Sequence, residues 1–236
     1  MKAKLIPPLI AIALTLGATG ASAGSTPAPT APDASGFVAR VDNPWFPLRP
    51  GTTLRYRGVK DGQPSRELFT VTSRTKVIEG VRCTVISDLL YLGGHLGERT
   101  RDWYAQDKAG NVWYFGEATA ELNPDGSVKS TEGSWQSGVD GARAGIYMPA
   151  HPRPGQTGVQ ELYAGHAEDH FRVLSLSADV QTPAVSSKRA LLTREWTPLE
   201  PRVVDHKLYV RGIGTVLEQT VKGGDERNEL VGMRRG

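Results

Sequence analysis

Between residues 98 and 121, acidic residues recur among large aromatic ones. In chain order the residues of interest are Glu98, Asp102, Tyr104, Trp113, Phe115 and Glu117. A hairpin whose turn centres on residues 108 and 109 predicts that Tyr104 lies opposite Trp113 and Asp102 opposite Phe115, with all six side chains on one face. Rings that cover apolar area beside carboxylates are typical of sites for sugars, cations or amphipathic ligands. The alternative is structural: the rings hold the sheet together, and the acids pair with neighbouring arginines.

A second group of polar residues follows in the segment from Glu195 to Pro201 and in the triplet Asp205-His206-Lys207. On an alternating strand over 203–210, His206 shares the apolar face, so we expect its side chain to be buried or to line a cavity. Such a histidine is either a hydrogen-bonded core residue or a ligand-binding or proton-transferring partner of Glu195 or Glu200.

The sequence assigns no metal, no cofactor and no catalytic residue. His166 and His170 are four residues apart, but Ala167 stands where the H-E-x-x-H motif needs glutamate, and no third ligand is evident. Cys83 is the only cysteine, which excludes an internal disulfide and a cysteine-rich metal site, and its apolar surroundings predict a buried side chain. The G-x-S-x-G, P-loop and dinucleotide motifs are absent, so nothing indicates a nucleotide-dependent enzyme.

Alternation of apolar and polar residues, interrupted by turn residues, predicts that these side chains are positioned by strands. The expected strands are 53–57, 67–72, 84–88, 99–104, 111–116, 170–176, 189–196, 203–210 and 215–221. Short connections imply antiparallel pairing, and helical periodicity is limited to a short candidate at 162–171. We therefore predict a mainly β protein: a single antiparallel, strongly curled sheet, half-barrel or barrel-like, with at most short helices.

The first 23 residues have the features of a secretory signal peptide: Lys2 and Lys4, an apolar run over 5–16, and the small residues of 21–23. The apolar run is too short to remain as a membrane span. Residues 24–35 are rich in Pro, Ala, Ser and Thr, which is typical of a flexible spacer, and 36–236 are expected to form a single β-rich domain. These features predict a secreted or periplasmic protein without a transmembrane segment in its mature chain.

The charge of the mature chain is close to balanced. The 28 basic residues of the whole chain include Lys2 and Lys4, which leaves 26 against 25 acidic residues. Because no dense block of Lys and Arg remains, the sequence does not favour a nucleic-acid partner.

Some of these strings resemble known families. D-W-Y-A-Q-D at 102–107, G-N-V-W-Y-F-G-E at 110–117 and E-W-T-P-L-E-P at 195–201 resemble a bacterial secreted family of unassigned function, over roughly residues 40–222. The turn at 212–216 is similar to the glycine-kinked hairpin of periplasmic half-barrel carriers of lipids or lipoproteins. The second resemblance implies a fold more than a function.

Two classes of function follow. In the first, a binding or carrier protein holds a small-molecule, lipid or glycan ligand on a concave face lined by Tyr104, Trp113, Phe115 and His206. In the second, a hydrolase or lyase acts on an extracellular polymer through two of the acids Glu98, Asp102, Glu117 and Glu195, spaced roughly 5 to 10 Å apart. A carrier predicts a mostly apolar pocket with unperturbed acids, whereas an enzyme predicts converging acids with at least one raised pKa.

Overall fold

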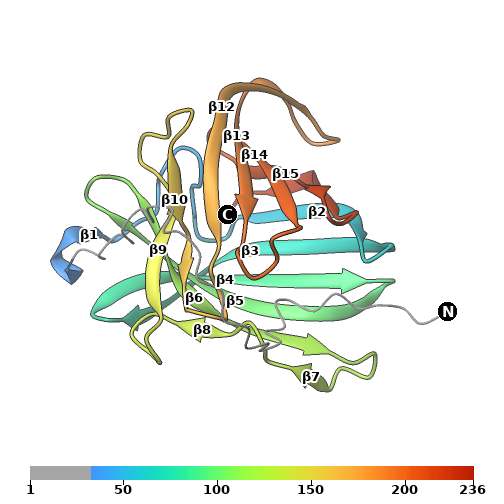
Figure 1. The fold of residues 1–236 in the computed structure, drawn as a ribbon, viewed down its shortest axis with the longest axis horizontal. Helices are drawn as coiled ribbons and strands as arrows, with labels where there is room; N and C mark the ends of the chain where they lie inside the picture. Colours follow the sequence, from blue (N-terminus) through green and yellow to red (C-terminus); the bar gives the residue numbers. More distant parts are fainter. Residues whose placement is uncertain (1–32) are drawn as a thin grey trace, which may run out of the picture.

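The computed structural model describes residues 33–236, which form one antiparallel sheet that curls until it nearly closes into a barrel (Figure 1). The predicted fold class is therefore confirmed. The predicted signal peptide, 1–23, lies outside the described residues, as does the spacer up to residue 32. The remainder of the spacer leads into a short 3-10 helix, η1 (Ala34–Gly36).

Sixteen strands make up the sheet. They are β1 (Phe37–Val38), β2 (Thr53–Lys60), β3 (Gln63–Ile78), β4 (Val81–Leu92), β5 (His95–Asp107), β6 (Val112–Leu122), β7 (Val128–Ser130), β8 (Trp135–Gln136), β9 (Arg143–Met148), β10 (Thr157–Val159), β11 (Glu161–Leu162), β12 (His170–Gln181), β13 (Ser186–Trp196), β14 (Val204–Val210), β15 (Gly214–Lys222) and β16 (Arg227–Arg234). Each strand expected from the alternation lies within one of these or begins one residue before it, although β3, β4, β5 and β13 begin three or four residues earlier than expected. The short helix expected at 162–171 is wrong: Tyr163 and Ala167 instead form a bridge across a tight turn.

Strand order explains how the barrel closes. The order is β10-β12-β13-β14-β15-β16-β2-β3-β4-β5-β6-β9-β11, so β16 joins the C-terminal strands to β2. The two ends of the sheet meet where β9 passes β10 and β11. At Gly145 a Cβ atom would lie 2.5 Å from the carbonyl oxygens of Val159 and Gln160, so only glycine permits this approach.

Apolar side chains gather on both faces of β5 and β6, because successive residues of a strand point to opposite faces. Tyr104 and Tyr114 belong to the main core inside the barrel. Trp113 and Phe115 belong to a separate cluster outside it, together with Cys83, which is fully buried. Burial raises the pKa of the Cys83 thiol to about 12, as expected for a small core residue.

The segment before β2 closes one end of the barrel interior. Trp45, Phe46 and Leu48 in this segment are buried. Asn43 fixes the path of the segment: its amide group donates to the carbonyl oxygens of Gly110 (2.9 Å) and Pro149 (3.1 Å).

Candidate ligand-binding cavity

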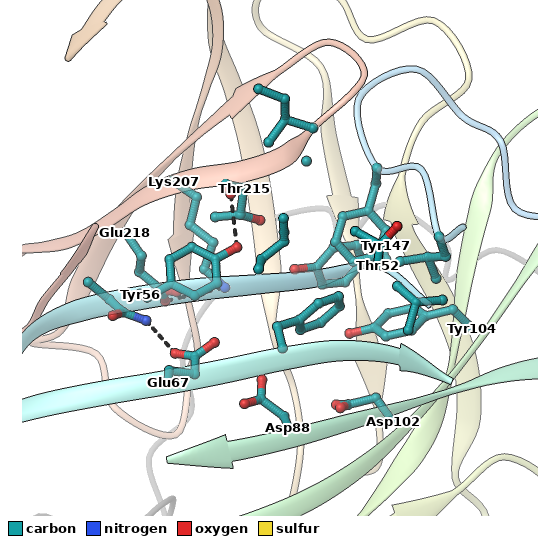
Figure 2. A pocket seen from close by; sticks show the side chains of 18 of the residues that line it. Thr52, Tyr56, Glu67, Asp88, Asp102, Tyr104, Tyr147, Lys207, Thr215 and Glu218 are labelled. Atoms are coloured by element: carbon teal, nitrogen blue, oxygen red, sulfur yellow. Dashed lines mark hydrogen bonds and ion pairs between the residues drawn. The ribbon is translucent and has the colours of Figure 1, made fainter. Parts of the chain in front are cut away.

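A cavity of about 240 Å³ lies inside the curled sheet, between the strands β2 to β5 on one side and β14 to β16 on the other (Figure 2). One end is aromatic, lined by Phe46, Phe69, Tyr104 and Tyr147. The ring of Phe46 lies 5.2 Å from that of Tyr104 and 4.6 Å from that of Tyr147, measured between centroids. These packed rings form an apolar end wall for the cavity.

The rest of the cavity is strongly acidic. Its lining contains Glu67, Asp88, Glu98, Asp102 and Glu218, with Lys60 and Lys207 as the basic residues. The register of the sheet brings the first four acids together. Asp88 on β4 lies opposite Phe69 on β3 and Thr100 on β5. Glu67 is two residues from Phe69, and Glu98 and Asp102 are two residues from Thr100, so all four side chains lie on the same face. In Figure 2, Glu67, Asp88 and Asp102 follow one another on neighbouring strands. We call Glu67, Asp88, Glu98 and Asp102 the acid wall.

Burial perturbs the acid wall. It raises the pKa of Glu67 to about 7, with the Glu218 charge adding to the effect. It likewise raises the pKa of Asp102 to about 7, even though the Tyr114 hydroxyl donates to Asp102 Oδ1 at 2.8 Å and so favours the carboxylate. The pKa of Asp88 is held well above its usual range by burial and then by the charge of Glu67. Glu67, Asp88 and Asp102 therefore retain protons closer to neutral pH than ordinary carboxyl groups do.

Hydrogen bonds satisfy the acid wall only in part. The side-chain amide of Asn228 donates to Glu67. Asp88 Oδ1 is buried and has no hydrogen-bond partner among residues 33–236. None of the ion pairs formed within this part of the chain reaches the acid wall.

The opposite side of the cavity is built around a lysine. Lys207 Nζ lies 3.1 Å from Glu195 Oε2 and 3.3 Å from Glu218 Oε1. The other oxygen of Glu195 accepts hydrogen bonds from the hydroxyls of Thr193 (2.8 Å) and Tyr209 (3.0 Å). Burial alone would lower the pKa of Lys207, but the two glutamates outweigh it and hold that pKa well above its usual range. We call Glu195, Lys207 and Glu218 the lysine wall.

A second cavity, of about 230 Å³, adjoins the first. Both are lined by Lys60, Lys207 and Glu218, and the second adds Glu195 and further acids. Those further acids are Asp169, Glu200, Asp205, Asp225 and Glu226. The polar space inside the barrel therefore continues from the aromatic end past Lys207.

The predicted register of the 98–121 hairpin is wrong. Tyr104 lies opposite Tyr114 and Asp102 opposite Glu117, with an irregularity between these pairs. Two features shift the pairing: the turn from Asp107 to Asn111 puts Gln106 opposite Val112, and a bulge beside Gly116 then puts Glu117 opposite Asp102. At Gly116 φ is +118°, and a Cβ there would lie 2.3 Å from the carbonyl oxygen of Trp135.

The slip separates the candidate residues of this hairpin. Glu98, Asp102 and Tyr104 line the cavity. Glu117 lies directly across from Asp102, and its pKa is held well above its usual range by burial and then by Asp102. Trp113 and Phe115 point to the outer face and line no part of the two cavities. Whether the cavity residues bind a ligand stays a prediction.

The other candidates also separate. Glu195 lines the second cavity, whereas His206 lies opposite Arg194 and Gln219 and lines neither cavity. The apolar face that His206 shares includes Leu208, which packs in a separate apolar cluster. The residues of β14 that face the cavities are therefore Asp205 and Lys207, and His206 is partly buried on the other face. A ligand-binding role for His206 stays a prediction.

The two spaced histidines form no metal site. His166 stacks on Tyr163 at 4.3 Å, and His170 stacks on Trp196 at 5.5 Å. Within residues 33–236, no group of three or more His, Cys, Asp or Glu is placed to hold a metal ion.

Sequence reasoning missed Glu67, Asp88, Lys207 and Glu218. A signal was present, because in the predicted strand over 67–72 a glutamate shares its face with Phe69 and Val71. A charged residue on an apolar face is unusual unless it has a partner or a function.

Comparison with known proteins yields similarity of fold alone. No protein-family model and no curated protein matches the sequence. A Bacteroides fragilis protein, described as exported with a YmcC-like fold, is 14% identical; the match covers 81% of this chain and 99% of that one, with a TM-score of 0.46. A Parabacteroides distasonis protein, described as a lipoprotein, is 10% identical; coverage is 80% and 98%, and the TM-score is 0.43. No helix within residues 33–236 is long and apolar enough to cross a bilayer.

Proposed function

We propose that this is an exported binding protein, secreted or periplasmic, whose residues 36–236 form one domain that holds a small organic ligand inside the curled sheet. The cavity of about 240 Å³ carries the proposal. Its combination of an aromatic end with a few converging polar groups is the usual composition of a small-molecule site. The export step rests on the signal-peptide features of residues 1–23.

The residues that line the cavity favour an amphipathic ligand. The mostly apolar pocket with unperturbed acids that we expected for a carrier does not match this cavity, because its acids converge and three of them have raised pKa values. The apolar part of a ligand fits the end formed by Phe46, Tyr104 and Tyr147, and its polar part fits the acid wall.

A second candidate is a hydrolase or lyase, which the perturbed acids favour. Glu67 and Asp102 have pKa values of about 7 and line one cavity, and Glu98 lies on the same strand as Asp102. A carboxylic acid that keeps its proton near neutral pH can act as a general acid beside an ionised partner. Degradation of glycans by the purified protein, lost in Asp102→Asn, would establish this function instead.

Native mass spectrometry of the protein secreted by its own host, compared with its denatured mass, tests the binding role. We expect extra mass on the native chain. Leu90 lines the cavity, whereas Leu89 is adjacent on the strand and lines none of the cavities described above, so they give a matched pair of variants.

Leu90→Trp should lower ligand occupancy at least tenfold because the larger side chain fills the cavity, and Leu89→Trp should retain it. A bare wild-type chain, or equal occupancy in both variants, would contradict binding in this cavity.

A further inference from the structure

We infer that the cavity selects an organic cation, a molecule with an ammonium group carried on an aromatic or aliphatic body. The inference rests on the proposed binding function and specifies the chemical class of the ligand. It draws on three features: the imbalance of charge in the lining, an acceptor oxygen without a donor, and the position of the aromatic end.

The lysines inside the cavity are already committed to other acids. Lys207 bridges Glu195 and Glu218, and Lys60 lies 3.9 Å from Glu226. No member of the acid wall forms an ion pair within residues 33–236, although the charge of Lys60 lowers the pKa of Glu67 from a greater distance. A cation that enters the cavity would supply the charge that the protein itself does not.

The acid wall also offers unused acceptors. Asp88 Oδ1 is buried with no hydrogen-bond partner among residues 33–236. Asp102 is only 8% exposed, and the side-chain hydrogen bond that it accepts from Tyr114 uses Oδ1. An ammonium group carries several N–H donors and no acceptor, so it complements carboxylate oxygens of this kind.

The aromatic end fixes the shape of the ligand. Tyr104 lies two positions after Asp102 on β5, and both line the cavity. Two positions on a strand correspond to about 7 Å, so an apolar group resting on Tyr104 and Phe46 places a nearby ammonium beside Asp102.

Entry of a cation should displace protons. The pKa values of Glu67 and Asp102, about 7, would fall beside an ammonium group. The titratable and charged groups that face this space are Glu67, Asp88, Glu98, Asp102, Glu117 and Glu218, the lysines Lys60 and Lys207, and the tyrosines Tyr56, Tyr104 and Tyr147. Affinity for a cation should therefore rise between pH 6 and pH 8, with release of protons.

Isothermal titration with three probes of the same body tests the inference: 4-phenylbutylamine, 4-phenylbutanol and 4-phenylbutyrate. At pH 7.5 we expect the amine to bind at least tenfold more tightly than the alcohol, and the carboxylate to bind most weakly. Buffers with different ionisation enthalpies should reveal proton release for the amine alone.

Asp102→Asn should lower amine affinity at least tenfold and leave alcohol affinity unchanged, whereas Asp179→Asn, at an exposed site outside the cavities described above, should change neither. Circular dichroism checks folding, and Asp88→Asn replaces Asp102→Asn if the latter unfolds.

Equal affinity for the amine and the alcohol, or tighter binding of the carboxylate, would overturn the inference that the ligand is a cation. Either result would still be consistent with the proposed binding function. If no probe binds, the charge of the molecule found by native mass spectrometry decides: a neutral or anionic ligand overturns the inference alone. A bare native chain that binds no probe overturns the inference and the proposed function together.

Discussion

The two walls of the cavity both bury acids, but they stabilise them differently. In the lysine wall, Glu195 receives an ammonium group and two hydroxyl donors. In the acid wall, Asp102 accepts a hydrogen bond from Tyr114, Asp88 Oδ1 has no hydrogen-bond partner among residues 33–236, and burial raises the pKa of both groups. The lysine wall is thus internally satisfied, whereas the acid wall has unmet bonding capacity that a ligand can use.

The largest effect on stability is expected when the lysine wall loses its positive charge. Lys207→Met leaves Glu195, which is 6% exposed, beside Glu218 without a positive partner. We expect a loss of about 3 kcal/mol in the free energy of unfolding, measured by urea denaturation at pH 7.5.

Lys60→Met is the matched control. The pair between Lys60 and Glu226 is long, at 3.9 Å, and its side chains are 32% and 40% exposed. We expect a change within about 0.5 kcal/mol. Equal losses in the two variants would show that the lysine wall has no special role.

The next largest effect should come from the acid wall, as a dependence of the free energy of unfolding on pH. The folded-state pKa of Asp102 is about 7 and its ordinary value 3.8, so between roughly pH 4 and pH 7 the folded chain binds more protons than the unfolded chain at this site. Stability from this group is therefore complete below pH 4 and is lost as the pH rises through 7.

Asp102→Asn should make the decline in stability between pH 5 and pH 8 shallower by roughly 2 kcal/mol, since asparagine cannot ionise. The measurement is urea denaturation at a series of pH values. Asp179→Asn, at an exposed position, should leave the decline as it is in the wild type. A decline that is the same in Asp102→Asn and the wild type would refute the assignment of raised pKa to this wall.

The smallest effect on stability and binding is expected at His206, which is adjacent to Lys207 but lies outside the cavity. His206→Ala should change the free energy of unfolding by less than about 1 kcal/mol, because the side chain is half-buried and lines neither cavity. Occupancy in native mass spectrometry should also stay at the wild-type level. Loss of ligand in this variant would show that His206 contributes to binding, and that the neighbouring positions His206 and Lys207 do not differ in this respect.

Much of the fold could be predicted because alternation is a local property. Nine of the strands between Thr53 and Lys222 carry it, and their short turns imply antiparallel pairing, whereas the shorter strands β7 to β11 were not predicted. The strand β16 was also missed, because its sequence ends in arginines that are typical of a solvated tail.

The cavity was harder to predict because it depends on register. The turn pairs Ala105 with Trp113, which puts Trp113 and Phe115 on the outer face, and the bulge at Gly116 then returns Glu117 to a position opposite Asp102. The bulge lies against Trp135, nineteen residues further along the chain. The acids of β3 and β4 become a site only when the sheet curls and brings them toward the lysine wall, which no local pattern specifies.

The position of β16 also sets the order in which the barrel can be completed. This strand pairs with β15 on one side and β2 on the other, so Leu230 lies opposite Tyr56. Until residues 227–234 are available, β2 and β15 remain open edges, and contacts of such high sequence separation form slowly. Completion of the cavity is therefore a late event in folding. A chain in which β16 has not yet paired has no enclosed site for a ligand.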